Sequence, residues 1–326
     1  MTVDFARAAE VLTEATDVAL ACHVNPDADA LGSMLGLSAF LRSRGVKTTC
    51  SYPNDPLDPP RWASMLPGSE DLVPAREFPK EPAVMVTCDC AAFDRLAQLG
   101  HVANRARELI WIDHHRSNDG LGTIPLIDGD ASSTCEMVFR LIETMGGQMP
   151  DATALCLYAG LVTDTGKFQY EATTPETLRV AARLREHDFD HSRLVQALYE
   201  DNPAPYLRLV GVALGRLEHV ADADLVWTYL TQADLQEAGV HAGETEDLID
   251  VIRTARDVDV AAIVKQQKDG RFKVSVRSRG GHDLARVAAA FGGGGHRLAA
   301  GYTSAQGPAE TVDRLIVALQ GEPVAS

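Results

Sequence analysis

The feature that most constrains this chain is a short apolar run that ends in an acid or an imidazole, and it occurs four times. The clearest case is the run at 108–112, ELIWI, which is typical of a buried strand and continues into Asp113, His114 and His115. In an open parallel sheet, ligand sites lie just beyond the carboxyl ends of the strands. The other runs are 18–22, followed by His23, Asp27 and Asp29; 83–88, followed by Asp89; and 155–163, followed by Asp164. Four such endings predict one shared site.

The segments between these runs predict alternating strands and helices. Residues 29–44 have the apolar spacing of a helix, with Gly45 as its stop signal. Ser133 and Glu136 have the spacing of a capping box that opens a helix reaching about Met145. Further helices are expected at 4–15, at 151–163 and after 174, and further strands at 46–52 and in the apolar runs at 18–22, 83–88 and 109–112. This alternation predicts an α/β fold with a mostly parallel sheet flanked by helices.

A proline-rich stretch at 202–205, Asn-Pro-Ala-Pro, marks the expected boundary between two domains. A length of 326 residues also suggests about two domains. We expect an N-terminal domain at 1–195, a linker at 196–212 and a smaller C-terminal α/β domain at 213–326. The second domain is expected to have strands near 224–230, 258–265 and 271–277, and helices near 246–255, 283–291 and 309–320.

The net charge of −16 argues against a protein that binds long nucleic acid. Such a protein normally carries a basic face, because neutralisation of phosphates supplies most of the non-specific affinity. Between Lys265 and Arg297, however, eight Lys or Arg residues stand against two acids. This local basic patch fits a small anionic ligand better than a long duplex.

The composition also predicts where the protein works. No apolar run reaches the ~18 residues that a membrane-spanning helix needs, and residues 1–7 lack the pattern of a secretory signal. The six cysteines, at 22, 50, 88, 90, 135 and 156, include no CxxC pair, so we expect buried reduced thiols. We therefore expect a cytoplasmic protein without a membrane partner.

Six of the residues that follow the apolar runs have the side chains of a metal site. They are His23, Asp27, Asp29, Asp89, His114 and Asp164. Four carboxylates in one site would repel one another and raise their pKa values unless cations were present. Two divalent cations would resolve this, and metals such as Mn²⁺, Fe²⁺ or Co²⁺ accept both carboxylate and imidazole. Such a pair, ~3.5–4 Å apart, suits in-line displacement at phosphorus. The alternative, that each Asp is only a helix cap or turn residue, explains one of them more readily than all four.

A glycine-rich segment at 292–295 follows the apolar run at 287–291 and leads into His296 and Arg297. Glycines allow positive φ and a close approach of the backbone, and successive N–H groups can bind an anion. A flexible linker is the alternative, but an apolar Leu-Ala-Ala follows at 298–300 with no serine-rich spacer. We therefore predict a ligand-binding loop.

Taken together, these motifs resemble a known family. Asp113-His114-His115 and the spacing of His23, Asp27 and Asp29 resemble the DHH phosphoesterase superfamily. The segment at 292–301, GGGGHRLAAG, resembles the DHHA1 domain. Their pairing and the chain length resemble the NrnA-type proteins, called oligoribonuclease or nanoRNase and pAp phosphatase.

The resemblance implies roles for individual residues. His23, Asp27 and Asp89 would hold one Mn²⁺, and Asp29, Asp89, His114 and Asp164 the other, with Asp89 as the bridge and Mg²⁺ or Co²⁺ as possible substitutes. His115 would face the substrate phosphate and Asp113 would orient an imidazole, so that Asp89, Asp113 and His115 are the expected catalytic residues. The nucleotide end away from the metals would be held by Arg277, Ser278, Gly293, Gly294, Gly295 and His296. Arg116 is a further candidate for phosphate binding, although a polar residue after a strand can equally be inert.

The resemblance also implies an activity. It predicts hydrolysis of short RNA to 5′-mononucleotides and of 3′-phosphoadenosine 5′-phosphate (pAp) to AMP, in a cleft between the two domains. Cyclic or linear dinucleotides such as c-di-AMP and pApA are further possible substrates, and a homodimer is expected. Three alternatives stay open: a RecJ-like exonuclease on single-stranded DNA, a family II inorganic pyrophosphatase, and a non-catalytic sensor of dinucleotides.

Overall fold

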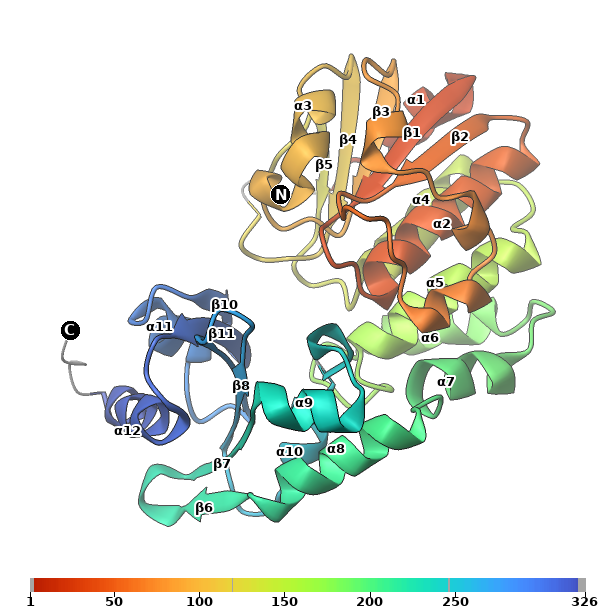
Figure 1. Ribbon diagram of the computed structural model, residues 1–326. Coiled ribbons are helices and arrows are strands. Elements are labelled where there is room, and N and C mark those ends of the chain that lie inside the picture. Colours follow the sequence, from red (N-terminus) through yellow and green to blue (C-terminus); the bar gives the residue numbers. More distant parts are fainter. Residues whose placement is uncertain (1–2, 119, 246, 322–326) are drawn as a thin grey trace. The chain divides into compact units, whose positions relative to one another are not determined.

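The chain divides into two compact units, and the boundary in the sequence falls between Asp201 and Asn202. The computed structural model describes residues 3–118, 120–245 and 247–321 (Figure 1). The unit boundary falls inside the linker expected at 196–212. That segment is largely helical, however, because α7 (His191–Tyr199) ends in it and α8 (Ala204–Gly215) fills most of the rest. The proline-rich turn at 202–205 therefore joins two helices directly.

The first unit is built on a five-stranded parallel sheet, which confirms the predicted fold class. The strands are β1 (Asp17–Cys22), β2 (Lys47–Ser51), β3 (Val84–Cys88), β4 (Glu108–Asp113) and β5 (Ile124–Ile127), in the order β2-β1-β3-β4-β5. Cys22 pairs with Cys88, and Cys88 pairs with Ile112. The residues that follow these three strands therefore start at the same level of one sheet edge.

Helices cover the two faces of this sheet differently (Figure 1). Leu20, Val86 and Ile110 lie in the main core, which also contains side chains of α1 (Phe5–Glu14), α2 (Ala28–Ser43), α4 (Thr134–Met145) and α5 (Asp151–Asp164). Ala21 and Trp111 point to the opposite face, against η4 (Phe93–Leu99) and α3 (Gly100–Ala103). The remaining elements are α6 (Pro175–Leu184) and the short 3-10 segments η1 (Arg61–Met65), η2 (Ser69–Asp71) and η3 (Ala75–Glu77).

Helices α2 and α5 approach each other closely at two glycines. A Cβ atom at Gly32 would lie 2.4 Å from the carbonyl oxygen of Cys156, and one at Gly160 would lie 2.7 Å from the Cα atom of Asp29. Neither position can therefore carry a larger residue without moving a helix. The contact brings the N-terminal turn of α2, with Asp29, beside α5, whose last residue is Asp164.

The second unit has a mixed sheet in the order β10-β11-β9-β8-β7-β6. Its described strands are β6 (Glu218–Val220), β7 (Leu225–Leu230), β8 (Val260–Gln266), β9 (Phe272–Ser278), β10 (Gly294–His296) and β11 (Ala299–Ser304). Among these, β7 and β8 pair in parallel and the other neighbours pair antiparallel. Side chains of α8, α9 (Gln232–Ala238) and α10 (Leu248–Ile252) pack on one face, and those of α11 (Leu284–Ala289) and α12 (Pro308–Leu319) on the other. Two 3-10 segments, η5 (Ala221–Ala223) and η6 (Ala242–Thr245), complete the unit.

Several expectations for the fold need correction. The helix expected at 246–255 is only the five-residue α10, and the strands β5, β6, β10 and β11 were not expected. The β10–β11 hairpin was missed because its glycines lack the alternating apolar pattern of a strand. The six cysteines are all free and buried, as expected. Among the helices that the structure describes, none has both the length and the apolar character needed to cross a bilayer.

Candidate metal centre

The structure brings all six expected metal ligands together at one edge of the parallel sheet. These residues and His115 form three groups, and within each group the potential ligand atoms lie within 4.8 Å of one another. They are His23, Asp27 and Asp89; Asp29, His114 and Asp164; and Asp89, His114 and His115. Asp164 reaches this edge from the C-terminal end of α5, whereas His23, Asp89 and His114 follow strands. The apolar run before Asp164 is therefore helical, and Asp164 nevertheless lies beside Asp29 and His114.

Asp89 lies at the centre of the cluster. Its Oδ2 atom is 3.4 Å from Nε2 of His23, and its Oδ1 atom is 3.6 Å from Nε2 of His114. The hydroxyl of Thr134 donates a hydrogen bond of 3.0 Å to Oδ1. Burial raises the pKa of Asp89, but the hydrogen bond from His23 and the charges of His114 and His115 outweigh it and lower the pKa below its ordinary value. This carboxylate thus stays ionised between two groups of ligands.

Asp29 is fixed by the first turn of α4. Its carboxylate accepts backbone hydrogen bonds from Thr134 (2.6 Å) and Cys135 (2.9 Å), two donors that have no partner within the helix. The residue is only 1% exposed. Burial, and then the charge of Asp89, raise the pKa of Asp29 to about 7. Burial and the charges of Asp29 and Asp89 also raise the pKa of Asp164 well above its ordinary value. The two acids therefore resist ionisation unless positive charge is added.

The donor set fits divalent metal ions. It combines carboxylate and imidazole, and burial together with the neighbouring carboxylates raises the pKa values of Asp29 and Asp164. Asp89 is grouped with His23 and Asp27, and separately with His114 and His115. Asp89 thus belongs to two of the three groups that could hold a metal ion.

His115 is held by a second aspartate. Its Nδ1 atom lies 2.6 Å from Oδ1 of Asp113, which is fully buried. The other oxygen of Asp113 accepts a hydrogen bond of 2.7 Å from the amide of Asn118. Burial lowers the pKa of His115, but the hydrogen bond to Asp113 and the charge of Asp89 outweigh it, so the net shift is upward. Asp113 thus orients the imidazole next to the expected metal ligands, and its hydrogen bond raises the pKa of His115.

Two residues of this site were not found from the sequence. Nη2 of Arg95 lies 2.8 Å from Nδ1 of His23, and the backbone carbonyl of Arg95 accepts a hydrogen bond of 3.0 Å from the N–H of Val24. Thr134 contacts Asp89 from the start of α4. Both lie on segments far from their partners in sequence, and no local pattern distinguishes them from surface polar residues.

Two polar residues after β4 have structural partners. Asn118 is buried and bonded to Asp113 and to the carbonyl of Cys90, so it does not face outward as a phosphate ligand would. Arg116 is exposed and pairs with Asp130 at 2.6 Å. The proposed contact between Arg116 and a phosphate would require this surface pair to open.

In the second unit, the strand register groups the expected nucleotide-binding residues. Ala299 of β11 pairs with Arg277 on one side and with the backbone of His296 on the other. The side chain of His296 lies outside what the structure describes. The hydroxyl of Ser278 donates a hydrogen bond of 2.9 Å to Asp259 and accepts one of 2.9 Å from the N–H of Gly280, so it holds its own loop.

The glycine-rich segment contributes backbone, as expected for a close approach. A Cβ atom at Gly293 would lie 2.2 Å from the carbonyl oxygen of Gly301, and Gly295 has φ of 143°. Gly294 and Gly295 belong to β10, so this part of the segment is a strand and not a free loop.

Comparison with known families assigns both units. The description "DHH family, N-terminal domain" matches residues 17–161, and "DHHA1 domain" matches residues 224–322. The acid and histidine cluster lies in the first of these and the glycine-rich segment in the second. The fold and the site thus define a two-domain protein of the DHH class with a DHHA1 domain.

Curated relatives are similar over most of the chain. A protein of Thermus thermophilus named bifunctional oligoribonuclease and PAP phosphatase NrnA is 33% identical over 287 residues, which cover 87% of this chain and 83% of the relative. The protein of the same name from Bacillus subtilis is 29% identical, covering 86% of each chain. A crystal structure of an exopolyphosphatase-related protein from Bacteroides fragilis superposes with a TM-score of 0.91 at 27% identity, covering 97% of this chain and 95% of that one. The chain belongs to this DHH–DHHA1 family.

Proposed function

We propose that this protein is a metal-dependent phosphodiesterase and phosphatase that cuts short oligoribonucleotides to 5′-mononucleotides and converts pAp to AMP. The observation that carries the proposal is the complete cluster of six metal ligands with Asp89 at its centre. The names of the relatives from Thermus thermophilus and Bacillus subtilis supply the substrate class. The enzyme is thus a phosphoesterase of the DHH type.

Each ligand has a specific place in the proposed centre. His23, Asp27 and Asp89 would hold one ion, and Asp29, Asp89, His114 and Asp164 the other; Mn²⁺ suits this mixture of imidazole and carboxylate, and Mg²⁺ or Co²⁺ are possible substitutes. When bound, such ions activate water and stabilise charge on the phosphoryl oxygens. Asp89, whose pKa is lowered, would be the ligand shared by the two ions.

His115 supports the reaction as a charged hydrogen-bond donor. Asp113 accepts a hydrogen bond from Nδ1, and this bond and the charge of Asp89 raise the pKa of His115 against the effect of burial, which favours the protonated ring. A cationic imidazole beside the metal ligands can donate to a phosphoryl oxygen as its negative charge develops. The roles of His115 and Asp113 are therefore to orient the phosphate and to stabilise charge.

The second unit would hold the nucleotide away from the reacting phosphorus. Arg277 offers a guanidinium group, and the segment from Gly293 through Gly295 to His296 offers backbone N–H groups close to Ala299. Ser278 would contribute only if its bond to Asp259 rearranged, so we rank it below Arg277.

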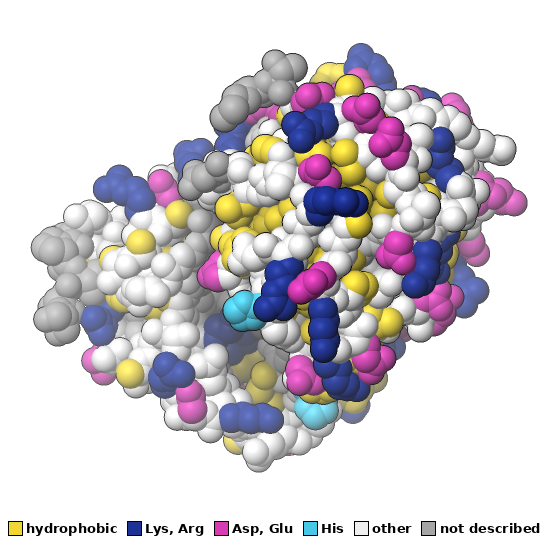
Figure 2. Space-filling view, turned by 90° about the horizontal axis from the view of Figure 1, so that it is seen from above, with side chains coloured by type: hydrophobic (Ala, Val, Ile, Leu, Met, Phe, Trp, Pro, Cys, Tyr) yellow, Lys and Arg dark blue, Asp and Glu magenta, His cyan; other side chains and the backbone are white. Residues whose placement is uncertain are grey.

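Charge favours short substrates. On the face of the first unit seen in Figure 2, Lys and Arg side chains are interspersed with Asp and Glu side chains and do not form one basic track. The net charge of −16 adds repulsion for every further phosphate. This favours a nanoRNase over a RecJ-like exonuclease on long single-stranded DNA.

The test is a panel of substrates with Mn²⁺ and with a chelator. The panel contains pAp, a diribonucleotide, pyrophosphate, a cyclic dinucleotide, and a 24-mer of the same sequence as the diribonucleotide. We expect metal-dependent turnover of pAp and the diribonucleotide. Preference for pyrophosphate or for the 24-mer would reassign the enzyme, and binding of a dinucleotide without any turnover would make it a sensor.

We also propose a cellular location and an oligomeric state for this protein. The six free, buried thiols are typical of a reducing compartment, and we propose a cytoplasmic enzyme. A homodimer is proposed from the family resemblance alone, and sedimentation of the full chain would test it.

A further inference from the structure

An aspartate and a histidine of the second unit form a pair that the proposed function does not use. Nδ1 of His282 lies 2.7 Å from Oδ2 of Asp259, which directly precedes β8. The side chain of Asp259 is 10% exposed and that of His282 is 27% exposed, so the carboxylate is shielded and the imidazole reaches solvent. Among the described residues, Nε2 of His282 forms no hydrogen bond. The pair therefore presents one ring nitrogen at the surface.

Three further groups hold Asp259 in place. Its carboxylate accepts hydrogen bonds from the hydroxyl of Ser278 (2.9 Å) and from the N–H groups of Arg279 (3.0 Å) and Gly281 (2.9 Å). A Cβ atom at Gly281 would lie 2.9 Å from Oδ2 of Asp259, so this position has no room for a side chain. The carboxylate is thus held at a fixed place, and it fixes the ring of His282 in turn.

The carboxylate also determines which ring nitrogen of His282 carries a proton. Burial raises the pKa of Asp259, but the hydrogen bonds from His282, Gly281 and Ser278 outweigh it and lower the pKa below its ordinary value. An ionised carboxylate only accepts hydrogen bonds, so Nδ1 of His282 carries the proton between them. Nε2 is then an acceptor when the ring is neutral and a donor when it is charged. A hydroxyl group can bond to Nε2 in both cases, because it both donates and accepts.

The loop that carries His282 is bonded to the residue that follows the glycine-rich segment. The N–H of Leu284 donates a hydrogen bond of 2.8 Å to the carbonyl of Arg297, and Nη2 of Arg297 donates one of 2.9 Å to the carbonyl of Gly280. Arg297 directly follows His296, the last residue of β10. His282 therefore lies at the end of the second sheet where β10 ends, close to the residues proposed to hold the nucleotide.

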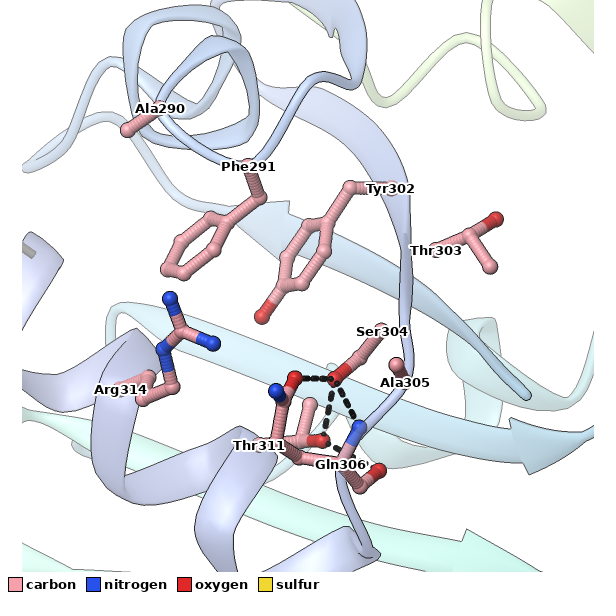
Figure 3. Close-up of a pocket in the computed structure, with 9 residues that line it drawn as sticks. All are labelled: Ala290, Phe291, Tyr302, Thr303, Ser304, Ala305, Gln306, Thr311 and Arg314. Carbon is pink, nitrogen blue, oxygen red and sulfur yellow. Dashed lines mark hydrogen bonds between the residues drawn. The ribbon is translucent and has the colours of Figure 1, made fainter. Parts of the chain in front are cut away.

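One face of the glycine-rich segment is closed and the other is open. A Cβ atom at Gly293 would lie 2.5 Å from Cβ of Tyr302, whose ring stacks on that of Phe291 with the centroids 4.3 Å apart (Figure 3). A Cβ atom at Gly294 would meet no atom within 4 Å. Successive residues of a strand point to opposite faces, so a ligand can approach the segment from the face opposite Tyr302. A nucleotide bound there can extend to the end of the sheet at which His282 lies.

We propose that Nε2 of His282 binds a ribose hydroxyl of the nucleotide held by the second unit. This inference rests on the proposed function, which assigns the nucleotide end to this sheet. The oxygens of a phosphodiester only accept, so they would bond to Nε2 only in the charged ring, and Arg277 already offers them a permanent charge. A ribose hydroxyl bonds to either form of the ring, and the 2′-hydroxyl is the group that distinguishes RNA from DNA. The hydroxyl could be a 2′-hydroxyl or the terminal 3′-hydroxyl, and the experiment separates them.

The experiment compares a diribonucleotide with three analogues. They lack the 2′-hydroxyl of the first ribose, the 2′-hydroxyl of the second ribose, or the terminal 3′-hydroxyl. For each compound, kcat/KM is measured with Mn²⁺, and the dissociation constant is measured by calorimetry of the chelated full chain. The variants are His282→Ala and His282→Gln, whose amide keeps a donor and an acceptor. His219→Ala is the matched control, because His219 is an exposed histidine of β6, at the opposite edge of the same sheet from β10.

We expect the wild type to lose about three- to tenfold in kcat/KM, and a similar factor in affinity, on one of the three analogues. That analogue identifies the hydroxyl. His282→Ala should lose a similar factor on the diribonucleotide and treat this analogue and the diribonucleotide alike. His282→Gln should restore part of the discrimination, and His219→Ala should behave as the wild type does. The proposal is overturned if the wild type treats all four compounds alike, or if His282→Ala still discriminates while melting at the same temperature.

The two readouts separate this proposal from the proposed function. Turnover of the diribonucleotide with Mn²⁺ but without discrimination would retain the phosphoesterase and remove the role of His282. Discrimination in binding to the chelated chain, without turnover in Mn²⁺, would retain the role of His282 and overturn the proposed hydrolysis. Absence of both turnover and binding would overturn both.

Discussion

Without divalent cations, the acid cluster predicts that the first unit loses stability as the pH rises from 5 to 8. The pKa of Asp29 in the folded protein is raised to about 7, so between its ordinary value and 7 the folded state binds more protons than the unfolded state. Stability therefore falls as pH rises through this window, by about 2.5 kcal/mol for Asp29 alone between pH 5 and 8. The raised pKa values of Asp164, His114 and His115 act in the same direction. A domain of this size shifts by about 2–4 °C per kcal/mol, so the expected fall in melting temperature is about 5–10 °C.

The assay is differential scanning calorimetry of the chelated full chain at pH 5 and pH 8. The Asp29→Asn variant removes the ionisable group and keeps one acceptor for the first turn of α4, so most of the difference should vanish. Asp17→Asn, at an exposed aspartate of β1, is the matched control and should keep it. Added Mn²⁺ should raise the melting temperature most at pH 8, because metal binding requires deprotonated ligands. Equal melting temperatures at the two pH values, or an unchanged difference in Asp29→Asn, would refute the reasoning.

Further predictions concern catalysis. Asp89→Ala should abolish hydrolysis of every substrate because it removes the shared ligand; retention of more than a few per cent with saturating Mn²⁺ would exclude the bridging role. Arg277→Ala should lower kcat/KM on a diribonucleotide by about tenfold or more and leave hydrolysis of bis(p-nitrophenyl) phosphate nearly unchanged, whereas Asp164→Ala should lose both; equal loss of the small diester in Arg277→Ala would place that residue in the chemistry. Turnover should fall from the diribonucleotide to a 24-mer at equal ionic strength, and equal turnover would contradict the argument from charge.

The sequence predicted most of this site because one rule of parallel sheets governs it. The carboxyl ends of neighbouring parallel strands meet at one edge, and the observed pairing of Cys22 with Cys88 and of Cys88 with Ile112 puts the following residues level with one another. Asp164 was predicted from the same pattern, although it ends a helix. Its carboxylate still lies beside Asp29 and His114 because α5 packs closely on α2.

The parts that the sequence did not predict depend on contacts between distant segments. Arg95 reaches His23 across 72 positions, and the hydroxyl of Thr134 reaches Asp89 across 45. Helical or strand periodicity carries no information about such pairs. Ser133 caps α4 as its spacing suggests, but Glu136 bonds to the N–H and the hydroxyl of Ser132, so the expected reciprocal half of the capping box is absent from the described hydrogen bonds.

The acids of the candidate metal centre repel one another, and contacts with residues outside the ligand set hold them close together. Asp29 could relieve the repulsion by moving away, but two backbone N–H groups of α4 hold its carboxylate, and the contact at Gly160 leaves α2 no room to shift towards α5. Asp89 is likewise fixed by Thr134, with a backbone φ of 56° that is uncommon for a residue with a side chain. When the ligands cannot move apart, a bound cation stabilises the folded protein strongly, because it removes the repulsion between the carboxylates. The same constraint that lowers the stability of the metal-free protein at pH 8 therefore keeps the ligands in position to bind metal, and a larger residue at Gly160 should weaken metal binding even though it touches no ion.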